Sequence, residues 1–273
     1  MSAVIIPDMP EETYYSHPAL SASGAKLLMR SPAHFRWARE HPTYKAAFDL
    51  GHYVHAKALG VGADVEIIDA EDWRTKAAQA ARDAAREAGR IPMLAKDAAV
   101  GDAMVASLRD WLEQARLAPL LTPGRGQPEV SIVWDDPEHG VQRRGRLDWL
   151  HEEIAGQPRV IVDLKTTVNA DPAAAGRTAA AFDYDMQAAW YVDLVRAATG
   201  AAEVEFWHLN VEKEPPHFVS GTRLTWEALE RGRARNAEAI RRYLDCLAVD
   251  QWPAYPTEII TIDLPAWAYR ESA

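Results

Sequence analysis

Apolar, β-branched segments separated by turn residues fill the middle of the chain. Three of them have the length and pattern of strands, at 129–135, 142–150 and 159–167. Pro137 and Gly140 fall between the first two, and the turn-like sequence AGQP falls between the last two. Because short turns connect antiparallel neighbours, this pattern predicts a meander of three strands.

Helical patterns lie on both sides of this meander. Ser21 or Ser23 is suited to cap a first helix, Pro32 begins a second, and a third carries His55. Further helices are predicted at 72–89, 94–118, 182–198 and 225–247, and further strands at 203–211 and 217–224. Residues 1–13 are expected to form a loose tail.

The order of these elements indicates the fold class. Strands followed by a helix, more strands and a closing helix fit a mixed central sheet with helices packed on its faces, an α/β (α+β) fold. The chain has 273 residues and is 48% hydrophobic, enough to bury one large core. We therefore expect a helical region at 1–128 that elaborates a core at 129–273, both within one integrated domain.

Three charged side chains interrupt the apolar strands of the meander. Side chains alternate along a strand, so Asp163 and Lys165 lie on one face, and Asp148 comes from the neighbouring strand. Such charges need a compensating partner, and Mg²⁺ or Mn²⁺ would suit two carboxylates. Lys165 could then orient or help to deprotonate a water that attacks a phosphodiester. The alternative is an ordinary ion pair on a strand, which is common and weak.

The balance of charge limits how the chain could bind nucleic acid. Its net charge is −10, whereas general nucleic-acid binders usually carry a basic surface. A DNA channel would need local positive charge from two groups of arginines. These are Arg143, Arg144 and Arg146, and Arg231, Arg235 and Arg242. For the second group the favoured interpretation is a solvated helix face with neighbouring glutamates.

Composition excludes several other classes of protein. The chain has no apolar run near eighteen residues, and its first residues lack the features of a signal peptide, so we expect a cytoplasmic protein that does not contact membranes. Cys246 is the single cysteine, which excludes internal disulfides and multi-cysteine zinc sites. It is expected to be a small buried hydrophobe.

The motifs occur in an order that resembles the PD-(D/E)XK nuclease superfamily, in its RecB-like branch. Within that branch the chain is most similar to the RecE-type exonucleases (exodeoxyribonuclease VIII) of phages and prophages. The matching residues are, in chain order, Gly51, His55, Glu129, Gly145, Asp148, Asp163, Lys165, Gln187 and Tyr191. Several RecB-like nucleases hold an iron–sulfur cluster with a cysteine at the position of Ser31. A cluster needs four thiolates, so one cysteine excludes it here.

The resemblance implies a metal site with defined ligands. His55, Asp148, Asp163 and the carbonyl of Leu164 would surround Mg²⁺ or Mn²⁺, with Lys165 beside the nucleophile. His52 is close enough in sequence to compete with His55, but only His55 fits the family motif. Structural roles remain open for both histidines. Glu129 would bind or brace the metal, or simply begin a strand.

Other residues are candidates for contacting substrate. Gln187 and Tyr191 share a helix face, and the matching pair in RecB-like nucleases lies beside the active site; an ordinary core tyrosine with an incidental glutamine is the alternative. Thr166 could bind phosphate or cap the sheet. Ser31 and Arg36 are candidates for holding a terminal phosphate.

The activity that the resemblance implies is degradation of linear double-stranded DNA from its ends, in the 5′-to-3′ direction, during phage-type recombination. A single-strand annealing protein would be a partner, a ring-like tetramer the assembly, and a bacterial or phage-infected cytoplasm the location. A noncatalytic DNA-binding module of nuclease fold is an alternative, although such a module need not keep all three charges. A nuclease with endonuclease or single-strand activity is another.

Overall fold

A computed structural model describes residues 3–41, 49–62, 64–264 and 269. In this part of the chain a sheet of seven strands runs in the order β1-β5-β6-β7-β8-β9, and β2 pairs with β6. The strands are β1 (Ala3–Ile6), β2 (Leu20–Ser21), β5 (Gly126–Asp136), β6 (Val141–His151), β7 (Arg159–Thr167), β8 (Val204–Glu212) and β9 (Val219–Arg223). β7 and β8 are parallel, whereas β5, β6 and β7 form the predicted antiparallel meander.

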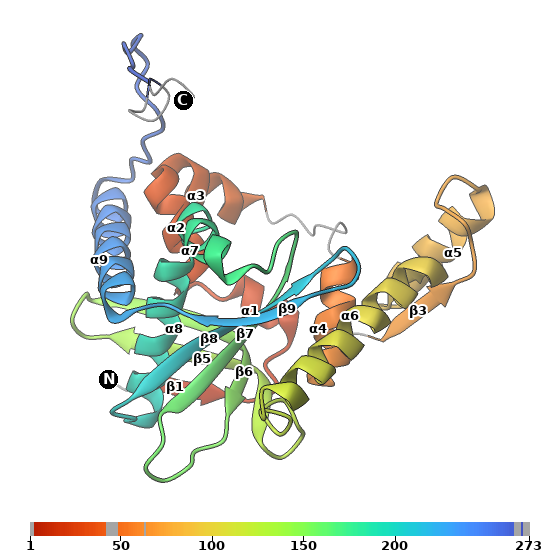
Figure 1. The fold of residues 1–273 in the computed structure, drawn as a ribbon. Coiled ribbons are helices and arrows are strands. Elements are labelled where there is room, and N and C mark those ends of the chain that lie inside the picture. The colour runs from red at the N-terminus through yellow and green to blue at the C-terminus, as the bar shows by residue number, and fades with distance from the viewer. Residues whose placement is uncertain (1–2, 42–48, 63, 265–268, 270–273) are drawn as a thin grey trace.

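Helices cover both faces of this sheet (Figure 1). The helices are α1 (Glu11–Ser16), α2 (Ala22–Arg30), α3 (Pro32–Glu40), α4 (Asp49–Leu59), α5 (Lys76–Glu87), α6 (Ala95–Gln114), α7 (Pro172–Ala181), α8 (Tyr184–Thr199) and α9 (Trp226–Val249). The mixed sheet with helices on its faces confirms the predicted fold class. α7 and α8 lie in the connection between the parallel strands β7 and β8, which cannot be joined by a tight turn.

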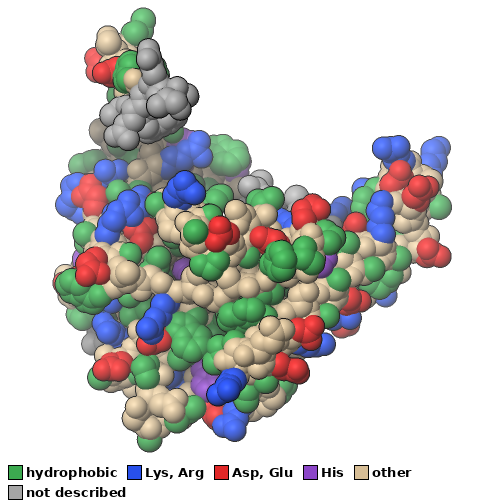
Figure 2. All heavy atoms as spheres, viewed as in Figure 1, with side chains coloured by type: hydrophobic (Ala, Val, Ile, Leu, Met, Phe, Trp, Pro, Cys, Tyr) green, Lys and Arg blue, Asp and Glu red, His purple; other side chains and the backbone are tan. Residues whose placement is uncertain are grey.

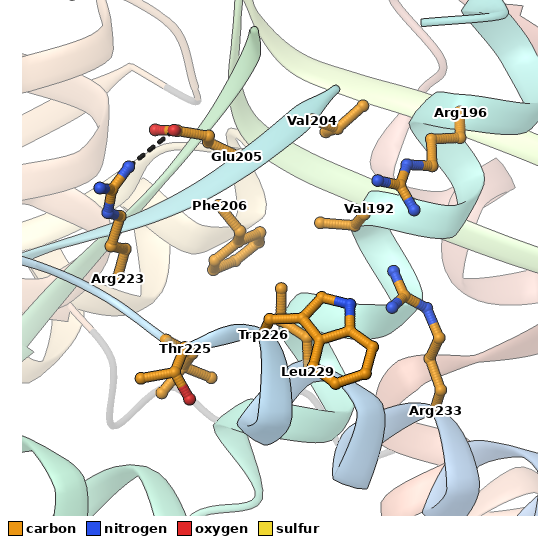
Figure 3. A pocket seen from close by; sticks show the side chains of 11 residues that line it. Val192, Arg196, Val204, Glu205, Phe206, Arg223, Thr225, Trp226, Leu229 and Arg233 are labelled. Atoms are coloured by element: carbon orange, nitrogen blue, oxygen red, sulfur yellow. Dashed lines mark hydrogen bonds and ion pairs between the residues drawn. The ribbon is translucent and has the colours of Figure 1, made fainter. Parts of the chain in front are cut away.

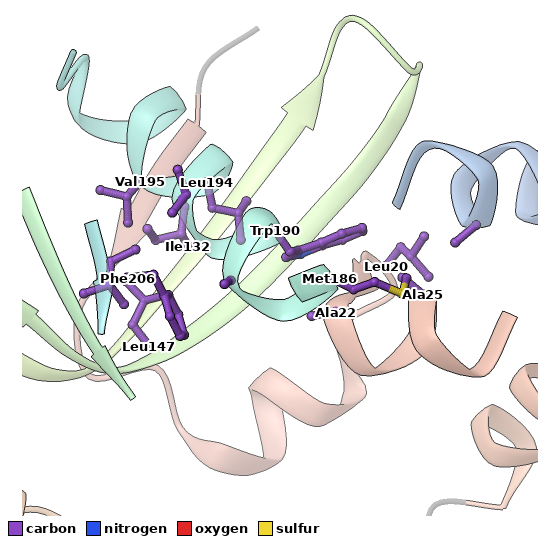
Figure 4. Close-up of a cluster of buried hydrophobic side chains, with 14 of the residues drawn as sticks. Leu20, Ala22, Ala25, Ile132, Leu147, Met186, Trp190, Leu194, Val195 and Phe206 are labelled. Atoms are coloured by element: carbon purple, nitrogen blue, oxygen red, sulfur yellow. The ribbon is translucent and has the colours of Figure 1, made fainter. Parts of the chain in front are cut away.

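Two apolar clusters hold the layers together. The larger one joins α2, α8 and α9 to one face of the sheet, and it includes Leu147, Trp190 and Phe206, all of which are buried (Figure 4). The second joins α4 and α6 to the opposite face, where Val162 and Leu164 are buried. Alternation along β7 therefore sends Val162 and Leu164 toward α4 and α6, and leaves Asp163 and Lys165 on the other face.

Residues 3–6 form a strand and a helix begins at Glu11, so the prediction of a loose tail at 1–13 is wrong for the described residues 3–13. β1 pairs antiparallel with β5, from Ala3 opposite Trp134 to Ile6 opposite Ser131, and α1 follows it. A four-residue edge strand is too short to leave a clear alternation in the sequence. Both β1 and β2 belong to the same sheet as the strands beyond residue 128.

A helical arm projects from one side of the sheet (Figure 1). It contains α5, the outer part of α6 and a small parallel pair of strands, β3 (Val65–Ile68) and β4 (Ile91–Leu94). The two helices were predicted from the sequence and the two strands were not. α4, which carries His55, packs against α6 and against β6 and β7 of the sheet.

Candidate active site

The strands β6 and β7 separate at the point where their charged residues lie. Their registered pairs are Trp149 with Val162 and Leu150 with Ile161, while β6 continues to pair with β5 as far as Val141. Beyond the last pair, the backbone N–H of Leu164 donates to Asp148 Oδ2 at 2.8 Å. The Asp148 carboxylate thus accepts a hydrogen bond that a backbone carbonyl of the neighbouring strand would accept in a regular sheet. We call the opening where β6 and β7 separate the fork.

Asp163 lies on the floor of the fork. It is 2% exposed, and its two oxygens face different partners. Gln187 Nε2 donates to Oδ1 at 2.8 Å, and the Lys165 ammonium lies 2.7 Å from Oδ2. Oδ2 has this ion pair but no hydrogen bond of good geometry. Burial, the largest influence, raises the pKa of Asp163 despite the Lys165 ammonium, and Asp148 adds to the increase.

His55 closes the fork from the side of α4. Its Nδ1 donates to the Gly51 carbonyl at 2.8 Å, which directs Nε2 toward Asp148 Oδ2 at 3.2 Å. Burial acts to lower the pKa of His55, but the Asp148 carboxylate outweighs it and raises that pKa to about 9. Burial acts to raise the pKa of Asp148, but His55 outweighs burial, so this pKa is lowered. His55, the predicted histidine ligand, therefore reaches the carboxylate of Asp148.

The side chains at the fork are of the kinds that bind a divalent cation. One imidazole and two carboxylates lie along it, and the hydrogen bond from His55 Nδ1 to a backbone carbonyl is the support that metal-binding histidines typically have. In this structure Lys165 and protonated His55 balance the two carboxylates. Within the described residues, no three His, Cys, Asp or Glu side chains already form a group arranged around one point.

Gln187 and Tyr191 support the fork from α8. Gln187 binds Asp163, and Tyr191 packs against Gly145, where an added Cβ would come within 2.9 Å of its ring and 2.6 Å of Leu194. Burial raises the pKa of Tyr191 well above its usual range. The glycine of the G-R-x-D motif is therefore needed for close approach of α8 to β6.

The other predicted site residues lie around the fork or away from it. Thr166 follows Lys165, and its hydroxyl faces Gly51. Glu129 is exposed on β5 between the registered pairs that flank Asp148, and it has a φ of 47°, unusual for a residue other than glycine. Ser31 is buried as the N-cap of α3, and Arg36 binds Glu40 and Asp250. Ser31 and Arg36 thus already have partners within the protein.

The arginines proposed for a DNA channel are largely used to hold the fold. Arg143 is buried, pairs with Asp136 at 3.1 Å and stacks on Trp190, which makes it unable to reach DNA. Arg144 and Arg146 lie over the Tyr14 ring. In the second group, Arg231 and Arg235 form ion pairs with Asp185 or Asp183, so they join α9 to α8, and Arg242 binds Glu238.

Three residues beside Lys165 were not identified from the sequence. Tyr184 lies with its ring centroid 5.2 Å from the Lys165 ammonium and 5.4 Å from that of Lys26. His208 stacks on Tyr184, at 5.2 Å between ring centroids. Burial lowers the pKa of Lys26 to about 8 and that of His208 to about 3, so His208 is neutral. A weak signal existed for Tyr184, which is three residues before Gln187 on the same helix.

Two hollows open on the face of the sheet that carries α8. A groove of about 870 Å³ begins at Lys165 and runs between α7, β8 and β9. A smaller cavity of about 450 Å³ lies between β8, α8 and the start of α9, and Figure 3 shows Arg196, Arg223 and Arg233 around it. Fork residues line only the groove. On the face shown in Figure 2, acidic and basic side chains are interspersed.

Among the described residues, no helix combines the length and the apolar character needed to cross a membrane.

Comparisons with known proteins agree with this geometry. The crystal structure of a protein from Eubacterium rectale that carries the name "Putative exonuclease" aligns over 96% of this chain and 97% of that chain, with a TM-score of 0.60 and 15% identity. At this identity the similarity bears on the fold alone. The structure called SSO0001 aligns over 74% of this chain and 85% of that chain, with 14% identity and a TM-score of 0.30, too low to support an argument. No curated protein matches.

A family model described as "PDDEXK-like domain of unknown function (DUF3799)" matches residues 21–264. This range includes α2, the helix that carries His55, both strands of the fork and α8. The chain has a PD-(D/E)XK-like fold and belongs to the PDDEXK-like family DUF3799.

Proposed function

We propose that this protein is a metal-dependent nuclease that hydrolyses DNA phosphodiester bonds at the fork. The observation that carries the proposal is the convergence of Asp148, Asp163 and Lys165 where β6 and β7 separate, with His55 against Asp148. A buried carboxylate, Asp163, beside a half-buried one, Asp148, is costly unless the pair serves a purpose such as cation binding. An ordinary surface ion pair would need neither the fork nor the second carboxylate.

Each residue of the fork has a distinct role in this proposal. His55, Asp148, Asp163 and the carbonyl of Leu164 would hold Mg²⁺ or Mn²⁺. The bound cation would supply Lewis acidity and would lower the pKa of a bound water that attacks the phosphodiester. Although burial acts to lower it, the neighbouring carboxylates hold the pKa of Lys165 above its usual value. Lys165 therefore contributes positive charge beside the scissile phosphate, where charge develops during hydrolysis.

The finer assignment is an exonuclease that degrades linear double-stranded DNA in the 5′-to-3′ direction during phage-type recombination. It rests on the sequence resemblance to RecE-type enzymes, as do a ring-like tetramer, a single-strand annealing partner and a cytoplasmic location. The name of the E. rectale protein points to the same class of activity. Light scattering of the purified protein tests the tetramer, because a monomer of 30.3 kDa contradicts it.

Cleavage assays test the activity directly. Linear duplexes labelled at either the 5′ or the 3′ end, and closed circular duplexes, are incubated with Mg²⁺, Mn²⁺ or EDTA. Loss of linear DNA alone, with early release of the 5′ label as mononucleotide, is the expected result. Cutting of circles would replace the exonuclease with an endonuclease, and digestion of single strands alone would indicate a single-strand nuclease.

A noncatalytic DNA-binding module remains distinguishable from these activities. It would bind DNA without metal-dependent loss of any substrate. That outcome would contradict the proposed nuclease.

A further inference from the structure

A ladder of three aromatic rings leads from the surface to the fork. Phe182 stacks on Tyr184 with 5.8 Å between centroids and an interplanar angle of 25°, and Tyr184 stacks on His208 at 5.2 Å and 26°. Phe182 is 61% exposed at the outer end, and His208 is 3% exposed at the inner end. The ladder therefore presents an open aromatic face to solvent, backed by the half-buried ring of Tyr184 and the buried ring of His208.

The connection that carries Phe182 is anchored to the protein. Lys26 Nζ donates to the Phe182 carbonyl at 2.9 Å. The next residue, Asp183, pairs with Arg235 of α9. A ring held on such an anchored segment loses less conformational entropy on binding than a ring on a free loop.

The ladder shares one groove with the proposed catalytic lysine. Phe182, Tyr184, His208 and Lys165 all line the groove of about 870 Å³, and Lys165 lies 5.2 Å from the Tyr184 centroid. The wall of this groove carries more positive than negative side chains, although the chain as a whole is acidic. They are Lys165, Lys213, Arg223 and Arg231 against Asp171 and Asp185.

Aromatic rings beside cationic groups are the chemistry that binds unpaired nucleic acid. Bases stack on aromatic side chains largely independently of sequence, while lysine and arginine attract the phosphates. A paired base inside a duplex is stacked between its neighbours, so it has no free face to offer to a protein ring. The groove volume is also in the range of sites for ligands of nucleotide size.

Resting on the proposed nuclease function, we propose that the ladder of Phe182, Tyr184 and His208 is a base-stacking subsite. It binds one unpaired base of the DNA strand whose phosphate lies at Lys165. The exposed face of Phe182 makes the contact, and Lys26 and Lys165, which both lie near the Tyr184 ring, hold the adjoining phosphates.

Binding of DNA with and without terminal bases tests this subsite. Duplexes carry a short 5′ or 3′ single-stranded overhang, with either natural nucleotides or abasic sites, and binding is measured by fluorescence anisotropy. Ca²⁺ replaces Mg²⁺, and gels verify that the DNA stays intact. Removing the bases from the preferred overhang should weaken binding to the wild type by about 5- to 100-fold.

The variants separate stacking from general affinity. Phe182→Ala should lose the difference between natural and abasic overhangs, whereas Phe182→Trp should keep it. Phe218→Ala is the matched control, because Phe218 is similarly exposed, at 66%, but does not line the groove. Thermal unfolding verifies that each variant is folded. The subsite is overturned if wild-type binding does not depend on the bases, or if the substitutions, including the Phe218→Ala control, all change this dependence equally. An absence of binding also overturns it.

This test can fail separately from the proposed function. Metal-dependent cleavage with base-independent binding would leave the nuclease intact and overturn the subsite. Base-dependent binding that Phe182→Ala abolishes, without cleavage under any metal, would support the subsite and contradict the nuclease.

Discussion

A divalent cation that binds at the fork has to displace the proton that His55 holds against Asp148. Since Asp148 raises the pKa of His55 to about 9, nearly all molecules carry this proton at pH 7. Two pH units below the pKa, the competition weakens apparent metal affinity by about 100-fold, or about 2.7 kcal/mol at about 1.36 kcal/mol per unit. Apparent affinity should therefore rise about tenfold for each pH unit between about 6.5 and 8.5.

Isothermal titration of the metal-free protein with Mn²⁺ measures this dependence. Titrations in two buffers of different ionisation enthalpy should give close to one proton released per cation at pH 7. His55→Gln removes the titrating group and should flatten the pH dependence of affinity. His139→Gln is the control, because His139 pairs with Asp136 on the β5–β6 hairpin. A wild-type affinity that does not change with pH, or an unchanged slope in His55→Gln, would refute the reasoning.

Four further predictions concern the residues around the fork. In EDTA, wild type should be more stable than His55→Gln below about pH 6.5, and this difference in unfolding free energy should vanish as pH rises through about 9. The reason is that the pKa of His55 is raised in the folded state. Urea titrations at several pH values measure the difference. Gln187→Ala should lower Mn²⁺ affinity or cleavage by about 10- to 100-fold with the fold retained, since Gln187 orients Asp163; a variant with wild-type affinity and rate would contradict this role. Gly145→Ala should cost about 1–3 kcal/mol of unfolding free energy, because its Cβ meets Leu194 at 2.6 Å, whereas Gly176→Ala, with open space around the added carbon, should cost nothing measurable. Arg143→Met should lower the free energy of unfolding by about 3 kcal/mol in chemical denaturation, because it leaves buried Asp136 without the guanidinium partner. The folded variant should still bind DNA normally; weakened DNA binding would indicate that Arg143 contacts DNA after all.

The three charged residues at the fork could be predicted because their arrangement depends on local geometry. Alternation along one strand places Asp163 and Lys165 on the same face, and a short turn brings Asp148 into the neighbouring strand. The sequence also separated strands from helices along most of the chain. Gln187 was correctly placed on a helix, but its hydrogen bond to Asp163 depends on how α8 packs on the sheet.

Features that depend on tertiary contacts escaped prediction. Lys26 and Phe182 meet although 156 residues separate them, and nothing in either segment indicates the other. The tail at 1–13 was misjudged because β1 gains its stability from pairing with β5 rather than from its own pattern. Arg143 looked like a surface cation, and only the close approach of Asp136 and Trp190 makes its burial tolerable.

Metal-dependent DNA cleavage by Asp163→Asn tests the central claim most directly. The substitution keeps the size of a side chain that is buried in the fork and removes the charge that a cation needs. Asp135→Asn is the matched control, because Asp135 lies in the same sheet and its carboxylate binds Gln142. With circular dichroism unchanged in both variants, cleavage in Mn²⁺ should fall at least about 100-fold in Asp163→Asn and remain near wild type in Asp135→Asn. Wild-type cleavage by Asp163→Asn would contradict the assignment of the fork as the active site.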